Sequence, residues 1–117
     1  MPATIQNERG KLVLDNDVFA TIAGLATVEN YGIVGMAAQS ASEGIWQLLG
    51  RDSVRRGVRI HTEDDHVTVD LHVMMQYGVS IIAVAENVIH NVSYRLEETT
   101  GVRVSSVNVH VEGVRVQ

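Results

Sequence analysis

The sequence predicts an α+β fold, in which a mixed sheet of three or four strands has two main helices packed on one face. Hydrophobic residues make up 45% of the chain and aromatic residues only 4%, so the core has to be aliphatic. Valine, whose branched side chain favours strands, occurs twenty times. Two alternating runs on either side of residues 64–65 are typical of a β-hairpin. A helical pattern and a further strand pattern follow them, and together they predict a right-handed β-α-β unit.

The length of 117 residues is that of one domain. Residues 1–9 are polar, and we expect a flexible N-terminus there. Residues 10–117 are interpreted as the single domain, because no linker or low-complexity segment interrupts them.

The first half of the chain contains two strand patterns and two helical patterns. Residues 10–15 alternate and predict the first strand. Apolar residues at helical spacing, preceded by aspartates that suit a helix N-cap, predict a helix at 17–30, with Gly32 placed to end it. Residues 33–37 are interpreted as a short strand or an extended connector, and residues 41–49 as a short helix.

The clearest pattern is a pair of alternating runs at residues 57–63 and 66–76, which predicts a β-hairpin. A two-residue turn at Asp64-Asp65 would place the apolar residues on one face and the charged residues on the other. The predicted register pairs Glu63 with His66, Ile60 with Val69, Val58 with Leu71 and Arg59 with Asp70. A longer loop would shift this register, and Asp-Asp is a poorer turn sequence than Asn-Gly.

A long helix is predicted at residues 80–99, where apolar residues recur at intervals of three and four. Gly78 breaks the strand that precedes it, and Ser80 is a suitable N-cap. Gly101 is placed to end the helix. We therefore interpret Gly78 and Gly101 as structural residues.

The last strand is predicted at residues 102–111, beside strand 66–76. Its apolar phase slips by one residue at Ser105-Ser106 and again at Glu112-Gly113, and each slip indicates a β-bulge. The two helices are expected to cover the apolar face of the sheet. The opposite face then carries the polar side chains of Arg59, His61, Asp70, His72, Asn108 and His110.

These polar residues include His61, His72 and His110, which together with Asp70 make a zinc site one alternative for this face. Their spacing matches no metal-binding signature, and strand alternation by itself places polar residues here. We therefore expect a face that is solvated or covered by a partner, with no metal and no cofactor.

Gly32 and Gly35 form a G-x-x-G spacing, which in some RNA-binding domains brings the backbone close to a phosphate. Here the two middle residues are Ile33 and Val34, whose apolar side chains favour packing into the core. We interpret both glycines as structural positions at which a helix and a strand approach closely.

Four arginines, Arg51, Arg55, Arg56 and Arg59, stand against one aspartate, Asp52, in an otherwise acidic chain. Such a cluster suits anionic lipid headgroups or a phosphate. The alternative is a solvated loop with some ion pairs.

The composition argues against several classes of protein. A formal net charge of −5 and a pI of about 5.4 disfavour duplex nucleic acid as a partner. The absence of cysteine excludes disulfides. No secretory signal and no apolar run of about 20 residues is present, so we expect a cytoplasmic protein without a transmembrane segment. No nucleophile motif, Walker loop or metalloprotease motif is present, so we expect no enzyme.

Three blocks of the sequence, at residues 10–37, 57–88 and 100–116, resemble the alkaline shock protein family of Gram-positive bacteria, also called the Gls-type envelope stress family. The motifs that carry the resemblance are G-I-V-G-M, Y-G-V-x-I and V-N-V-H-V-x-G-V, in that order. The resemblance implies a small cytoplasmic α+β domain tied to cell-envelope stress. It further implies a non-enzymatic protein that is prone to assemble and that a membrane-anchored partner holds near the membrane, and it supplies no catalytic or metal residues.

The sequence thus leads to the hypothesis of an interaction module that forms homo-oligomers and docks on a membrane-anchored partner at the inner face of the membrane. Strands 57–63 and 102–116 are the candidate contact surface. The candidate interaction residues are Arg51, Arg55, Arg56, Arg59, Asp70, His72 and His110. The alternative is a module that binds nucleic acid or a phosphate or acyl ligand through the Gly32–Gly35 loop and the arginines of residues 51–59.

Overall fold

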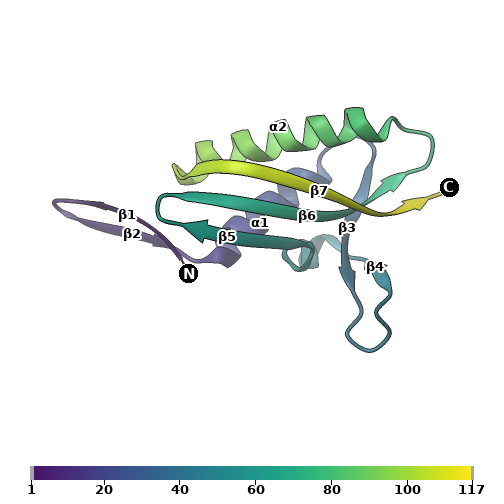
Figure 1. Ribbon diagram of the computed structural model, residues 1–117, viewed down its shortest axis with the longest axis horizontal. Helices are drawn as coiled ribbons and strands as arrows, with labels where there is room; N and C mark the ends of the chain where they lie inside the picture. Colours follow the sequence, from purple (N-terminus) through teal and green to yellow (C-terminus); the bar gives the residue numbers. More distant parts are fainter. Residues whose placement is uncertain (1, 117) are drawn as a thin grey trace.

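The centre of the structure is strand β6 (His66–Gln76), which is paired along both of its edges (Figure 1). One edge pairs in parallel with β7 (Arg103–Arg115). The other edge is shared by two antiparallel strands, β5 (Val58–Glu63) beside the first half of β6 and β3 (Ile33–Gln39) beside the second half. Strand β4 (Trp46–Leu48) pairs with β3 and completes a five-stranded mixed sheet.

Two helices, α1 (Asn16–Val28) and α2 (Ile81–Thr100), pack on one face of this sheet and against each other. This is a computed structural model, and it describes residues 2–116. The side chains of β6 that face the helices are fully buried, namely those of Val67, Val69, Leu71 and Val73. The predicted α+β class is thereby confirmed, whereas the structure has a third, short helix besides the two predicted main ones.

The predicted hairpin is confirmed residue by residue. β5 and β6 pair Glu63 with His66 and Val58 with Leu71, so the connecting turn has two residues. Asp64 adopts a positive φ of 51° in this turn, a conformation that aspartate tolerates better than most residues.

The β-α-β unit and its boundaries also follow the sequence. The Ser80 hydroxyl accepts a hydrogen bond of 3.3 Å from the backbone N–H of Ala83 and caps α2. Gly101 ends the helix in the left-handed conformation, at a φ of 77°. Strand β7 then runs parallel to β6, with shifts of register after Val104 and after Val111. Both shifts are the bulges that the apolar phase predicted.

The first half of the chain differs from the sequence-based prediction in two places. Residues 41–49 do not form a helix, because β4 turns back along the free edge of β3. The Gln39 side chain donates a hydrogen bond of 2.7 Å to the carbonyl of Gly44 and closes this turn. The apolar spacing of residues 45–49 fits either structure, and the available edge of β3 decided between them. The sheet therefore has five strands rather than three or four.

The second difference concerns residues 1–9, for which the sequence predicted no strand. Residues Ala3–Asn7 form β1 and pair with β2 (Gly10–Leu14) in a separate two-stranded hairpin that projects from one end of the molecule (Figure 1). Ala3 is buried at 1% exposure, and it attaches this hairpin to the core. Met1 and Gln117, which the predicted N-terminal segment and domain include, lie outside the described residues.

A short 3₁₀ helix that the sequence did not predict, η1 (Arg51–Gly57), joins β4 to β5. Val54 packs so closely on α1 that a Cβ at Gly24 would lie 2.8 Å from the Val54 side chain. At its other end, a Cβ at Gly57 would lie 2.9 Å from the carbonyl oxygen of Ala37 and 2.9 Å from Cβ of Met36. Both contacts require glycine, and they fix η1 between α1 and the sheet.

None of the helices within residues 2–116 combines the length and the apolar character needed to cross a bilayer.

We predict that Gly57→Ala lowers the free energy of unfolding by about 1–3 kcal/mol, because the added methyl group meets backbone atoms that cannot move independently. Gly10→Ala is the matched control, since nothing lies within 4 Å of a Cβ at Gly10. Its effect is expected to stay within about 0.5 kcal/mol. Urea unfolding monitored by circular dichroism measures both values, and equal midpoints for the two variants would contradict the close packing of η1.

Candidate functional site

The face of the sheet opposite the helices carries a cluster of polar side chains centred on Asp70 of β6. The neighbouring strands bring Asn108 and His110 of β7 and His61 of β5 to the same face, because each strand alternates. The Asn108 side chain donates a hydrogen bond of 3.0 Å to Oδ1 of Asp70. His110 Nε2 lies 3.3 Å from the same oxygen, and His61 Nε2 lies 3.5 Å from Oδ2.

These contacts change the acidity of Asp70. Burial by itself raises the pKa of this carboxyl group. The hydrogen bonds from Asn108 and His110, and the charges of His110 and His61, outweigh the burial and lower the pKa of Asp70 from its usual value of 3.8. Asp70 is therefore an ionised acceptor that holds side chains of three strands together.

A second group on the same face is centred on His72, whose ring lies between two other aromatic rings. The Trp46 ring stacks on it at a centroid distance of 5.0 Å, and the His110 ring stacks at 4.7 Å. Nδ1 of His72 lies 2.7 Å from Oε2 of Glu112, within hydrogen-bond distance. We call the six residues His61, Asp70, His72, Asn108, His110 and Glu112 the polar face.

The structure thus brings together His61, Asp70, His72 and His110, as the alternation predicted. It adds Trp46 and Glu112, which the sequence reasoning missed. Trp46 was assigned to a helix that does not form. Glu112 occupies the second bulge of β7, and the phase slip at that position was the available signal, because a bulge redirects a side chain.

The zinc alternative finds no support in the geometry. His61 and His110 approach Asp70, whereas His72 approaches Glu112, so the three imidazoles do not converge on one point. Within residues 2–116, no group of three or more histidine, aspartate or glutamate side chains is arranged to hold a metal ion.

The four arginines Arg51, Arg55, Arg56 and Arg59, which we call the arginine cluster, are all exposed. Three lie on η1 and Arg59 lies on β5, so they belong to ordered elements and not to a solvated loop. Within residues 2–116, none of them lies within 4.0 Å of a carboxylate oxygen. Arg56 and Arg59 line two neighbouring cavities of about 310 and 340 Å³.

The glycines of the G-x-x-G spacing are occupied by packing contacts. Gly32 lies in the turn after α1 at a φ of 92°, and a Cβ there would lie 2.6 Å from the Val84 side chain of α2. A Cβ at Gly35 would lie 2.9 Å from Cδ1 of Leu48. Ile33 packs against the core, as predicted, whereas Val34 is only half-buried and is not among the side chains packed on the core. The loop therefore joins three packed elements, and its geometry does not favour a phosphate contact.

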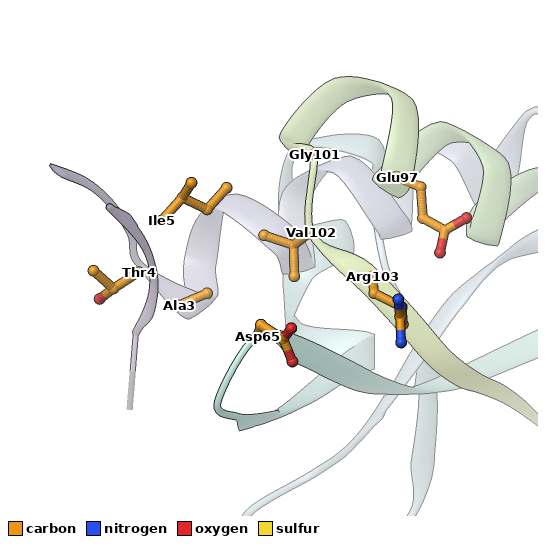
Figure 2. Close-up of a pocket in the computed structure, with 8 residues that line it drawn as sticks. All are labelled: Ala3, Thr4, Ile5, Asp65, Glu97, Gly101, Val102 and Arg103. Atoms are coloured by element: carbon orange, nitrogen blue, oxygen red, sulfur yellow. The ribbon is translucent and has the colours of Figure 1, made fainter. Parts of the chain in front are cut away.

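A larger cavity of about 450 Å³ lies where the N-terminal hairpin meets the core (Figure 2). Its charged side chains are Asp65 of the β5–β6 turn, Glu97 of α2 and Arg103 of β7 (Figure 2). Glu97 accepts a hydrogen bond of 2.9 Å from the backbone N–H of Val104 and so supports the start of β7. We interpret this cavity as the space left between β1 and the α2–β7 connection.

Comparisons with known proteins agree with one another. Residues 4–116 match the model of the alkaline shock protein 23 family, which is described as having a cell envelope-related function. The chain is 37% identical over 117 residues to the uncharacterized protein YloU of Bacillus subtilis, covering 99% of this chain and 98% of the relative. It is 35% identical to the uncharacterized protein Spy1614 of Streptococcus pyogenes, covering 99% and 97% of the two chains.

A more distant relative carries a functional name. The chain is 27% identical over 107 residues to the stress response regulator gls24 homolog of Streptococcus pyogenes, covering 92% of this chain and 60% of that protein. No solved structure matches the chain.

We predict that Asn108→Ala raises the pKa of Asp70, because the carboxylate loses its hydrogen-bond donor. Carboxyl chemical shifts followed by NMR between pH 2 and pH 7 measure the change (about the range of a carboxyl titration). The exposed Asn87→Ala of α2 is the control. A titration of Asp70 that is identical in wild type and Asn108→Ala would contradict the contact.

The same contact predicts a pH dependence of stability. The folded-state pKa of Asp70 is lower than its unfolded-state value, so its stabilisation is fully present above that value of 3.8 and is lost as the pH falls through the folded-state pKa. We therefore expect the difference in unfolding free energy between wild type and Asn108→Ala to shrink below about pH 4. Urea unfolding at a series of pH values measures it.

Proposed function

The chain belongs to the alkaline shock protein 23 family of cell envelope-related proteins, and from this membership we propose that it is a non-enzymatic module that self-associates and docks on a membrane-anchored partner at the cytoplasmic face of the envelope. The membership confirms the resemblance seen in the sequence. The name of the gls24 relative supports a role in the response to stress.

The observation that carries self-association is the outer edge of β7. Within residues 2–116, this thirteen-residue strand pairs only with β6, so one row of its backbone N–H and C=O groups has no strand partner. A long open edge is a template for pairing with a second chain. The other outer strands are shorter, since β4 has three residues and β5 has six. The start of α1 also contacts β5 through a hydrogen bond of 3.0 Å from Thr62 to Asn16.

Exposed apolar side chains lie beside the open edge. Helix α2 runs along β7 (Figure 1). Its Asn91 donates a hydrogen bond to Asn30 at the end of α1, and Arg95 pairs with Glu29 at 3.1 Å, so this flank of α2 faces α1. Ile82 and Ile89 are about 160–180° around the helix from Asn91, on the flank away from α1. They are exposed at 72% and 38%.

A second copy of the chain can pair with the open edge of β7 and cover the exposed isoleucines of α2. An antiparallel pairing of β7 with β7 of another copy is two-fold symmetric, so each copy presents the same edge and the same helix flank to the other. The regular segment between the two bulges, Ser106–Val111, carries no arginine, lysine, aspartate or glutamate. This pairing leaves the arginine cluster, which lies on η1 and β5, outside the contact, where a membrane-anchored partner can bind.

The contacts on the polar face support a role other than catalysis. They join three imidazoles and one amide to carboxylates, and no nucleophilic hydroxyl takes part in them. The carboxylate at the centre is held ionised, which suits a structural acceptor better than a general acid.

We predict that the purified chain sediments as a dimer or a larger assembly at micromolar concentration and that Ile82→Asp combined with Ile89→Asp shifts it to monomer. Burial of each isoleucine stabilises the contact by about 1.5–3 kcal/mol, and the charge reverses this gain. Ile45→Asp is the matched control, because Ile45 is exposed at 56% in the β3–β4 turn, away from β7. Analytical ultracentrifugation measures the masses, and a wild-type monomer throughout the concentration range would overturn the proposal.

Docking on a membrane protein requires a separate experiment. We expect the chain to bind membrane vesicles from its own cells and to lose this binding after the vesicles are treated with protease. Flotation in a density gradient measures the bound fraction. Binding that is unchanged by protease would contradict a protein partner.

A further inference from the structure

The cavity of about 310 Å³ beside the arginine cluster has the size of a small-ligand site. Five side chains line it together with the backbone region of Ala37 and Ala38, and they are Gln39, Trp46, Arg56, Arg59 and His72. They come from β3, β4, η1, β5 and β6, so the cavity exists only in the folded chain. Its lining contains two permanent positive charges and no carboxylate.

The two guanidinium groups are an unusual charge arrangement in a chain of formal net charge −5. Arginine does not lose its proton in proteins, so the repulsion between Arg56 and Arg59 is not relieved by deprotonation. Within residues 2–116 neither side chain lies within 4.0 Å of a carboxylate oxygen. An anion between them would gain from both charges.

The backbone that carries the arginines is held in place before any ligand arrives. Gly57, between Arg56 and Arg59, lies directly on the sheet, because a Cβ there would be 2.9 Å from the Ala37 carbonyl oxygen and 3.2 Å from that of His72. On the other side of η1, Val54 packs against Gly24 of α1. Binding therefore orders only the arginine side chains, which lowers its entropic cost.

The side chains that form the opposite wall of the cavity are also held in place by contacts within the protein. His72 is stacked between Trp46 and His110, and its Nδ1 contacts Glu112 at 2.7 Å. Gln39 is oriented by the hydrogen bond from its Nε2 to Gly44. This wall combines an aromatic surface with polar atoms and suits a small organic group attached to an anion.

The identity of the anion follows from the geometry of the donors. Guanidinium groups bind phosphate and carboxylate through paired N–H donors. A carboxylate offers two oxygens in one plane, whereas a phosphate offers oxygens in tetrahedral directions that two arginines from different elements can share. We propose that this cavity binds the phosphate group of a small phosphomonoester or of a phospholipid headgroup, with Arg56 and Arg59 as its ligands and Trp46 and His72 as its wall. This site does not depend on self-association, because it lies across the sheet from the β7 edge.

Trp46 is the single tryptophan of the chain, so its fluorescence reports on this cavity alone. The wild-type protein is titrated with inorganic phosphate, with glycerol 3-phosphate, and with vesicles of phosphatidylglycerol in phosphatidylcholine. Vesicles of phosphatidylcholine alone show whether the zwitterionic headgroup suffices. We expect a saturable change in fluorescence with glycerol 3-phosphate if the source is a free phosphomonoester, and with anionic vesicles if the source is a lipid.

The variants Arg56→Gln and Arg59→Gln are tested singly and together. Each is expected to weaken binding about tenfold, because each removes a charge-assisted hydrogen bond. The two residues lie on different elements, so one variant remains informative if the other is poorly folded. The double variant Arg9→Gln/Arg103→Gln removes the same charge from the β1–β2 turn and the start of β7, and it should bind as the wild type does.

Saturable binding of any of the phosphate compounds that is lost in the Arg56 and Arg59 variants and kept in the Arg9/Arg103 control supports the proposal. Three results overturn it: no saturable change with any compound, equal binding by wild type and the Arg56/Arg59 double variant, or equal losses in that variant and the control. None of these three results depends on self-association, which sedimentation measures. The phosphate-site proposal and the self-association proposal can therefore be contradicted independently of each other.

Discussion

The structure depends on the position of β6, which is paired on both edges and covered on one face by α1 and α2. Its helix-facing side chains, three valines and one leucine, are completely buried. A strand in this position has to alternate strictly, because a slip of one residue would place its polar set in the core. Strands β3, β5 and β7 take their register from this strand, and β4 takes its register from β3.

The same alternation creates the polar face. Once Val69 and Leu71 point to the helices, Asp70 and His72 have to point away from them, and the neighbouring strands add His61, Asn108 and His110 beside them. The carboxylates of Asp70 and Glu112 then connect the strands through their side chains. The polar face is thus a consequence of the core, although its composition suits binding to another molecule.

Two close contacts made by glycines connect the core to the arginine cluster. Gly24 and Gly57 allow η1 to lie between α1 and the sheet, and this places two arginines next to Trp46 and His72. Arg56 and Arg59 are therefore part of a defined cavity instead of a mobile basic loop. The open edge of β7 lies on the other side of the sheet, so assembly and ligand binding can occupy separate surfaces of one small domain (Figure 1).

The sequence by itself determined the elements whose signal is local: the hairpin and its register, the caps and length of α2, both bulges of β7 and the residues of β6 on each face. These follow from periodicity and from turn and capping chemistry within a few residues. Only the tertiary structure decided that residues 46–48 pair as a strand, that residues 3–7 form a hairpin, and that Trp46 and Glu112 join His72. The contacts of Trp46 and Glu112 with His72 join residues far apart in the sequence. The two hairpins are local, but the free edge of β3 and the buried Ala3 favour them, and the apolar spacing of these short segments does not specify either feature.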